Sequence, residues 1–531
     1  MNFKELTSEQ IDKARNIYLN KEITWDDRMK QLTDLFGKSE RTVRKWCSDK
    51  LGFKEKVDIV SEQYELAKKR KLDKNKGRFI ITWAQNNTPI HERFFENIKA
   101  YAQAIDADIH VIAGRYKNPT SVFSDEQEEH WDNRVVEYLD ANRHDVHKYL
   151  SIMSDIKIQP TATNPMSGLQ GVSGINSCVF GAPKVQLEMI PVLEGNKPKA
   201  MVTTGSVTKK NYTDSKSGKK GEFHHTYGFT IVEIKDNETF YSRQVTADDK
   251  NGSFCDLYYK VDNGVVSKVN EIEAIVFGDM HYGNHDQDVI DATHDMLVDI
   301  KPNHVILHDV FDGMSINHHE MNDPFVQYAK EMNGTNDLGK ELDIMMRGLA
   351  DFSDYKNVVI VRSNHDDFLD RWLKNGDWKK QPTYKNSRLY MKLSDLLLEQ
   401  YEKTPHKVKG VIPGLINEKF PKFITLGRSD SYRVKNWELG QHGDYGTNGS
   451  RGSLNQFRNL NTKIIVGHYH TPGRKDGALA VGTSTKLRMG YNSGASSWLQ
   501  SHVIIHKDGR AQHINFVKDS SNKTGFTTFE Y

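Results

Sequence analysis

The C-terminal half of the sequence places acidic, amide and imidazole side chains at the ends of apolar segments that are typical of buried strands. The segment EAIVFGDMH ends with Asp279 and His281, whose side chains share one side because side chains alternate along a strand. Open α/β sheets bind ligands at the carboxyl ends of their strands. The residues at these ends are Asp279, His281, Asp309, Asn364, His442, His468 and His470. Mixed imidazole and carboxylate ligands suit manganese, iron, zinc or nickel better than magnesium or calcium alone, so the pattern predicts a divalent-metal site.

Each of these elements taken alone has an ordinary explanation. A single Asp-x-His occurs by chance, and a lone buried histidine needs only a hydrogen-bond partner. Five such elements in a fixed order, each after a predicted strand, are poorly explained by chance. No cysteine lies near them, which argues against a structural zinc site.

The ordered set resembles the signature of the calcineurin-like metallophosphoesterases, whose members include the SbcD-type nucleases. That signature runs Asp-x-His, Gly-Asp-x-x-Asp, Gly-Asn-His-Asp/Glu, a lone His and Gly-His-x-His. Here the motifs read Asp279-Met280-His281, His308-Asp309-Val310-Phe311-Asp312, Ser363-Asn364-His365-Asp366, His442 and Gly467-His468-Tyr469-His470. His308 and Ser363 replace two glycines of the signature, but neither occupies a ligand position. The resemblance covers roughly residues 271–520.

The resemblance implies two divalent ions, with Mn²⁺ favoured and Fe, Zn, Ni or Mg as alternatives. It assigns Asp279, His281, Asp309 and His470 to one ion, and Asp309, Asn364, His442 and His468 to the other. Asp309 would bridge the two. His365 would face the scissile phosphate as general acid or transition-state contact, and Asp366 would orient its imidazole. Two such ions stabilise charge on a phosphate and make hydroxide available near neutral pH.

The resemblance also implies a four-layer α/β/β/α sandwich over residues 271–520. We expect strands in FITLGRS, VKNWELGQH, TKIIVGHYH and WLQSHVIIHKDG to form its second sheet. Residues 79–265 begin with a β-α-β pattern and predict a separate small α/β domain of unassigned role. Residues 521–531 form a polar tail, either an ordered arm or a frayed end.

The N-terminal 60 residues predict a helix-turn-helix-like segment, with one helix ending at Gly37 and a second starting after Ser39. A basic linker follows at residues 61–78. The candidate DNA contacts here are Arg41, Arg44, Lys45, Lys68, Lys69 and Arg70. Short helical hairpins with surface arginines are common, and a basic run is often a solvated linker, so both alternatives stay open.

Three features favour DNA as the substrate: the N-terminal segment, the basic linker, and the run WLKNGDWKK after the third motif. In that run Trp372 and Trp378 lie among cations, as in surfaces that stack bases, although burial of both tryptophans is the more common outcome. One alternative is a phosphatase or phosphodiesterase acting on nucleotides or phosphoproteins, with the N-terminal half used for assembly. Another is a DNA-binding regulator with an inactive phosphoesterase domain.

Bulk properties limit the remaining choices. The chain has 531 residues, 37% of them hydrophobic, and a net charge of +2, which fits a globular protein of more than one domain. No apolar run is long enough to span a membrane, and the three dispersed cysteines are typical of a reducing compartment. Length, N-terminal extension and the His-Asp-Val-Phe-Asp motif are similar to the pre-early DNases of T-five-like coliphages. That likeness implies host-DNA degradation in the bacterial cytoplasm, with no membrane partner and homo-oligomerisation as an option.

Overall fold

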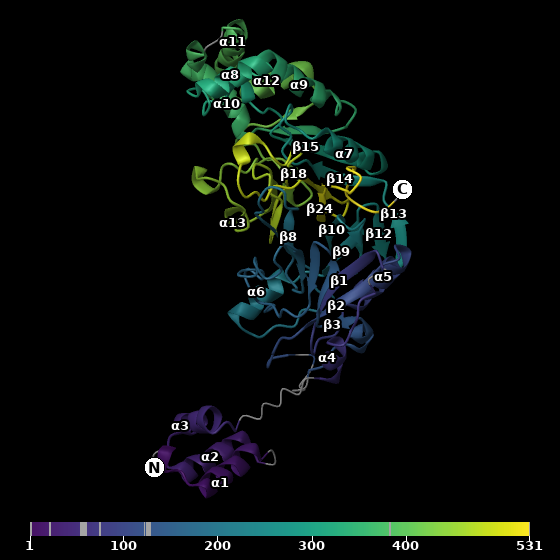
Figure 1. The fold of residues 1–531 in the computed structure, drawn as a ribbon, viewed down its shortest axis with the longest axis vertical. Helices are drawn as coiled ribbons and strands as arrows, with labels where there is room; N and C mark the ends of the chain where they lie inside the picture. Colours follow the sequence, from purple (N-terminus) through teal and green to yellow (C-terminus); the bar gives the residue numbers. More distant parts are fainter. Residues whose placement is uncertain are drawn as a thin grey trace. The chain divides into compact units, whose positions relative to one another are not determined.

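Two units make up the chain, Met1–Glu65 and Leu66–Tyr531 (Figure 1). The structure is a computed structural model that describes residues 3–20, 23–53, 61–73, 76–121, 123, 129–381 and 384–529. Residues 54–60 of the predicted helical segment, 74–75 of the predicted linker and the last two residues of the predicted tail therefore lie outside the described residues. In the described part of the chain, no helix has both the length and the apolar character needed to cross a membrane.

The first unit consists of short helices around a small apolar core. Its elements are η1 (Phe3–Glu5), α1 (Ser8–Leu19), α2 (Trp25–Phe36), α3 (Glu40–Lys45) and the π-helical turn η2 (Trp46–Lys50), and α4 (Glu62–Ala67) leads into the second unit. Gly37 ends α2 in the left-handed conformation (φ 60°), which glycine adopts without steric cost. Met29, Phe36 and Val43 are buried between the helices. The predicted helix, glycine turn and second helix are thus present.

A five-stranded sheet with the order β10-β9-β1-β2-β3 begins the second unit. Its strands are β1 (Arg78–Gln85), β2 (Asp108–Gly114), β3 (Leu139–Asp140), β9 (Gly228–Ile234) and β10 (Phe240–Thr246). Strands β1 and β2 are parallel and are connected by α5 (Glu92–Ala104), which confirms the predicted β-α-β unit. A small sheet follows, made of β11 (Phe254–Asp256), β12 (Tyr259–Asp262) and β13 (Val265–Lys268).

A buried ion-pair network joins these two sheets. The guanidinium of Arg243 on β10 lies 2.5 Å from Asp256 Oδ1 and 2.8 Å from Glu233 Oε2, and all three residues are buried. Replacing Arg243 with methionine should lower the free energy of unfolding by about 3–5 kcal/mol, because two buried carboxylates lose their counter-ion. Urea denaturation measures this change. Arg143→Met breaks the half-exposed pair with Asp155 and serves as control; a loss of under about 1 kcal/mol is expected there. Equal losses in both variants would contradict the prediction.

A six-stranded sheet with the order β17-β16-β15-β14-β23-β24 follows. Its strands are β14 (Glu271–Val276), β15 (Lys301–His308), β16 (Val358–Val361), β17 (Ile424–Thr425), β23 (Ser501–Ile505) and β24 (Ala511–Asn515). Strands β14 to β17 are parallel to their neighbours in that order, whereas β23 and β24 are antiparallel. Its helices are α7 (Gln287–Asp299), α8 (Pro324–Asn333), α9 (Leu338–Ala350), α10 (Asn364–Asn375), α11 (Ser387–Lys403) and α12 (Val411–Lys419).

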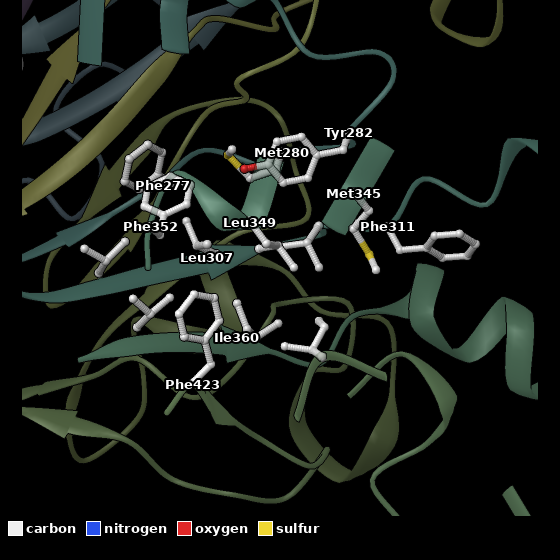
Figure 2. Close-up of a cluster of buried hydrophobic side chains, with 14 of the residues drawn as sticks. Phe277, Met280, Tyr282, Leu307, Phe311, Met345, Leu349, Phe352, Ile360 and Phe423 are labelled. Atoms are coloured by element: carbon white, nitrogen blue, oxygen red, sulfur yellow. The ribbon is translucent and has the colours of Figure 1, made fainter. Parts of the chain in front are cut away.

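One apolar core fixes α7, α9, α10, α11 and α12 to the outer face of the six-stranded sheet. Figure 2 shows Leu307 and Ile360 from the sheet beside Met345 and Leu349 from α9. The same core contains Met280, which immediately precedes the predicted ligand His281. The loop after β14 is therefore held in place by packing against this core. The predicted mixed α/β class is confirmed by these layers.

A ten-stranded sheet faces the six-stranded one. Its order is β18-β19-β20-β22-β21-β7-β8-β6-β5-β4. Its strands are β4 (Arg143–His147), β5 (Leu150–Met153), β6 (Ser177–Phe180), β7 (Gln186–Ile190), β8 (Lys199–Thr203), β18 (Arg433–Val434), β19 (Trp437–Glu438), β20 (Lys463–Val466), β21 (Gly473–Lys475) and β22 (Ala478–Ala480). Val276 and Val359 of the six-stranded sheet share a core with Ile465 and Leu479 of the ten-stranded sheet.

The ten-stranded sheet corrects two sequence-based expectations. Strand β7 pairs with β21, so one sheet contains strands from both expected domains, 79–265 and 271–520, and both belong to one compact unit. The segments FITLGRS and SHVII were expected in the second sheet, but as β17 and β23 they extend the first sheet at its two sides. Strand partners are chosen by packing between distant segments, and the local pattern of a short apolar strand does not encode them.

The described part of the C-terminal tail is an ordered arm. Its strand β26 (Thr524–Gly525) pairs with β25 (Val517–Lys518), which precedes the tail, and Thr527 Oγ1 donates to Glu233 Oε2 (2.7 Å). The other described elements are η3 (Asn133–Tyr138), α6 (Lys216–His224), η4 (Met314–Ile316), η5 (Asp377–Lys380), η6 (Thr447–Gly449), α13 (Leu454–Phe457) and η7 (Gly490–Asn492). The cysteines are free thiols, buried at Cys47 and Cys178 and half-buried at Cys255.

Candidate metal centre

All the predicted ligand residues lie just beyond the carboxyl ends of strands. Asp279 follows β14, Asp309 follows β15, and Asn364 begins α10 after β16. His442 follows β19, and His468 and His470 follow β20. Both facing sheets therefore contribute ligands to one place, as the strand-end pattern predicts.

The first cluster consists of Asp279, His281, Asp309 and His470. One ligand atom from each residue lies within 4.8 Å of the others. The Nε2 atoms of His281 and His470 are 3.0 Å apart, and His470 Nε2 is 3.3 Å from Asp279 Oδ2. Four buried donors converging on one point could hold a divalent ion, and the grouping matches the predicted first site.

The second cluster consists of Asp309, His442, His468 and Asn364. His442 Nε2 lies 3.1 Å from Asp309 Oδ2. Asn364 Oδ1 lies 3.1 Å from His442 Nε2 and 3.1 Å from His468 Nδ1. Asp309 is thus common to both clusters, because its Oδ2 is also 3.5 Å from His281 Nε2.

The backbone of the ligand loops is held in an unfavourable conformation. His281, Asp309, His468 and His470 have positive φ angles of 42°, 47°, 75° and 55°. Non-glycine residues rarely adopt such angles, which cost about 1–3 kcal/mol each and occur preferentially at functional sites. The rest of the fold therefore offsets the conformational free energy of these four residues, and the resulting backbone directs their side chains towards the clusters.

Gly467 is required by the close approach of the two sheets. A Cβ atom at this position would lie 2.3 Å from Asp279 Oδ1 and 3.0 Å from His308 Cβ. Only glycine leaves room for the Asp279 carboxylate beside the loop that carries His468 and His470.

The electrostatics of the cluster fit a bound cation. Both carboxylate oxygens of Asp279 and Oδ1 of Asp309 are buried without a hydrogen-bond partner in the described structure. Burial raises the pKa of Asp279 to about 7. Burial also opposes ionisation of Asp309, but His442, His365 and His281 outweigh it and lower the pKa of that carboxyl. Buried, unsatisfied anionic oxygens among imidazoles are the donor set that divalent transition metals prefer.

His365 lies beside the clusters but is oriented differently from the prediction. Its Nδ1 is hydrogen-bonded to the backbone carbonyl of Asp312, and its ring is 4.6 Å from that of His281. The expected contact with Asp366 is wrong. The Asp366 carboxylate instead accepts from Ser363 N (2.9 Å), in a capping box at the start of α10. The residue at the third helical position points back to the cap, because that satisfies an otherwise unpaired backbone N–H.

Asp312 is a site residue whose role the sequence analysis left unassigned. Its Oδ1 lies 3.0 Å from His281 Nδ1, and Asn284 Nδ2 donates to its Oδ2 (3.1 Å). A carboxylate that accepts the second N–H of a ligating imidazole fixes the ring and its tautomer. The second aspartate of the Asp-x-x-Asp motif was the signal that could have identified this role.

Removing the Asp312 carboxylate should weaken metal binding without removing a ligand. We expect Asp312→Ala to raise the dissociation constant for Mn²⁺ by about 10- to 100-fold, because His281 loses its orienting partner. Calorimetric titration of the metal-free protein measures this change. Asp351→Ala, on the surface after α9, is the matched control and should bind Mn²⁺ like the unaltered protein. Unchanged affinity in Asp312→Ala would show that the His281 ring is held by packing alone.

The side chains predicted to contact DNA outside the metal centre differ in whether they are exposed or bonded within the fold. Arg41, Arg44 and Lys45 are exposed on α3, and Arg44 pairs with Glu40. Lys68 and Lys69 are exposed as well. Arg70 instead donates to the backbone carbonyls of Glu137 (2.7 Å) and Ile109 (2.9 Å), so its guanidinium is occupied within the fold.

The two tryptophans proposed as base-stacking residues have structural positions. Trp372 is buried, and Trp378 packs against the same core beside Tyr390. The more common fate of tryptophan, burial, is thus the outcome at Trp372.

Comparison with known proteins identifies one relevant relative. No family model matches this chain, and no solved structure matches it. Protein A1 of Escherichia phage T5 is 32% identical over 498 residues, which cover 87% of this chain and 84% of that protein. The similarity extends over most of both chains and so includes far more than the strand-end motifs. This chain belongs to the family of Protein A1 of Escherichia phage T5.

Proposed function

We propose that this protein is a divalent-metal-dependent phosphodiesterase that hydrolyses DNA, with the α/β/β/α fold of the calcineurin-like metallophosphoesterases. The observation that carries the proposal is the pair of adjacent clusters that share Asp309. The two facing sheets, with helices on the outer face of one, support the fold assignment.

The protein side chains have distinct tasks in this reaction. Bound at the two clusters, divalent cations would neutralise charge on the phosphate and acidify water. His365 donates its Nδ1 proton to the carbonyl of Asp312, which leaves Nε2 to hold or deliver a proton at the leaving oxygen. Burial lowers the pKa of His365, which favours its neutral imidazole.

The exposed cations and the relationship to a phage protein favour DNA as the substrate. Exposed cations on α3 and at residues 68–69 suit phosphate contacts. The relationship to a protein of a phage is consistent with a nuclease that acts on DNA in the cytoplasm of the host cell. Mn²⁺ is the metal we propose, because imidazole and carboxylate donors are mixed at both clusters, with the Asn364 amide added at the second.

Cleavage of plasmid DNA tests this proposal. Linear and circular plasmids are incubated with the protein and Mn²⁺, Mg²⁺ or EDTA, beside His365→Ala. Loss of both DNA forms with Mn²⁺, but not with EDTA or in the variant, is the expected result. Intact DNA together with rapid turnover of bis(p-nitrophenyl) phosphate would instead favour nucleotides or phosphoproteins as substrates.

A further inference from the structure

A basic cavity of about 660 Å³ lies along α10, the helix that begins with Asn364 and His365. Its walls are formed by one face of α10, by residues 406–409 and by residues 427–430. Cavities of this size hold ligands of several hundred daltons, enough for one or two nucleotides of one strand. The cavity is separate from both candidate metal clusters, since none of their ligands lines it.

The charge of the lining is positive and partly uncompensated. The lining contains six lysines and arginines against three aspartates, a difference of three positive charges. Arg362 and Arg428 are compensated by Asp367, and Arg362 is also paired with Asp370. The lining cations that have no carboxylate partner in the described part of the chain, and whose side chains are exposed, are Arg371, Lys374 and Lys407.

Two of these cations share a helix with His365 but lie on another side of it. Arg371 and Lys374 follow His365 by six and nine residues, which is about 9 and 13.5 Å along the axis and roughly 120° and 180° around it. A strand that leaves His365 therefore has to pass around α10 to reach the cavity. Between His365 and Arg371 lies Phe368, whose ring is 4.8 Å from that of His365, with the Arg371 guanidinium 5.9 Å from its centroid.

We propose that this cavity binds the backbone phosphates of a single DNA strand that passes around α10 from the phosphate held beside His365. The inference rests on the proposed DNase function and adds the substrate form: a strand long enough to reach from the metal centre to the cavity. A mononucleotide is too short to reach Arg371, and a phosphoprotein offers no evenly spaced phosphates. Arg371 supplies an exposed planar cation, a group that contacts bases of unpaired strands.

The test measures how the rate of hydrolysis depends on substrate length, with the cavity cations present and after their replacement. Oligothymidylates of 2 to 12 nucleotides and bis(p-nitrophenyl) phosphate are hydrolysed with Mn²⁺ by the full chain and by the triple variant Arg371→Gln, Lys374→Gln, Lys407→Gln. For the unaltered protein we expect kcat/KM to rise with length until the strand spans both the metal centre and the cavity. The triple variant should lose this rise, so that its ratio of 12-mer to small-diester kcat/KM falls at least about 10-fold. Lys392→Gln, exposed on α11 away from the cavity, is the matched control and should keep the ratio.

Salt dependence provides a second readout. Binding of the labelled 12-mer is followed by fluorescence anisotropy in EDTA from 50 to 300 mM KCl. Removing three phosphate contacts should flatten the slope of log K against log salt by about 2, at roughly 0.7 per single-strand contact. A triple variant with unchanged length dependence and slope would overturn the cavity assignment and leave the DNase proposal intact. Turnover of the small diester with no cleavage of any oligonucleotide would overturn both.

Discussion

Asp309→Ala is expected to remove bound metal and to reduce phosphodiester hydrolysis by more than about 10³-fold. Asp309 Oδ2 lies 3.1 Å from His442 Nε2 and 3.5 Å from His281 Nε2, so one carboxylate serves both clusters. Its removal leaves each cluster with one anionic donor fewer. Loss of a single preorganised electrostatic contact costs about 10²–10³ in rate, and here two sites are affected together.

Metal content by elemental analysis and the initial rate on bis(p-nitrophenyl) phosphate measure the two effects in one preparation. Circular dichroism and thermal unfolding establish that the variant is folded. Asp343→Asn, which alters an exposed carboxylate on α9, should retain both metal and activity. An Asp309→Ala protein that holds its full metal content would show that the clusters do not depend on a shared ligand.

His365→Asn should give a different pattern, with metal retained and kcat reduced by about 10²- to 10⁴-fold. His365 lies outside the two clusters that share Asp309; with His281 and Asp312 it forms a third group whose ligand atoms lie within 4.8 Å of one another. Its Nδ1 is engaged by the Asp312 carbonyl. The remaining ring nitrogen is therefore the group lost to the reaction. Asparagine can keep a hydrogen bond to that carbonyl but cannot transfer a proton.

Steady-state kinetics with Mn²⁺ and metal analysis of the same sample separate this pattern from that of Asp309→Ala. His304→Asn, which alters a half-buried histidine on β15 that contacts Tyr432, is the matched control. Full activity in His365→Asn would remove this residue from the chemical step. Joint loss of metal and activity would instead assign His365 to ion binding. The ring of His365 lies 4.6 Å from that of the ligand His281, so the measurement distinguishes these two roles.

The ligand set was predictable from sequence because each ligand follows a strand whose apolar pattern is local. Asp279, Asp309, Asn364 and His468 each stand within a few residues of such a segment, and parallel strands deliver their ends to one edge. The β-α-β unit after residue 78 and the glycine stop at Gly37 were predictable for the same reason. Periodicity and turn chemistry over ten to fifteen residues contain this information.

Contacts between distant segments were decided by the tertiary structure alone. The pairing of β7 with β21, nearly three hundred residues apart, merges two expected domains into one sheet. The burial of Trp372 and the exposure of Arg371 depend on which face of α10 meets α12 and the sheet. His365 Nδ1 donates to the carbonyl of Asp312, in the loop after β15, and not to the neighbouring Asp366. The Asp366 carboxylate is occupied by the helix cap, where it accepts from Ser363 N. The local sequence pattern determines which side chains stand at the end of a strand. Long-range packing determines which of these side chains contact one another, because burial and steric fit depend on segments that are far apart in the sequence.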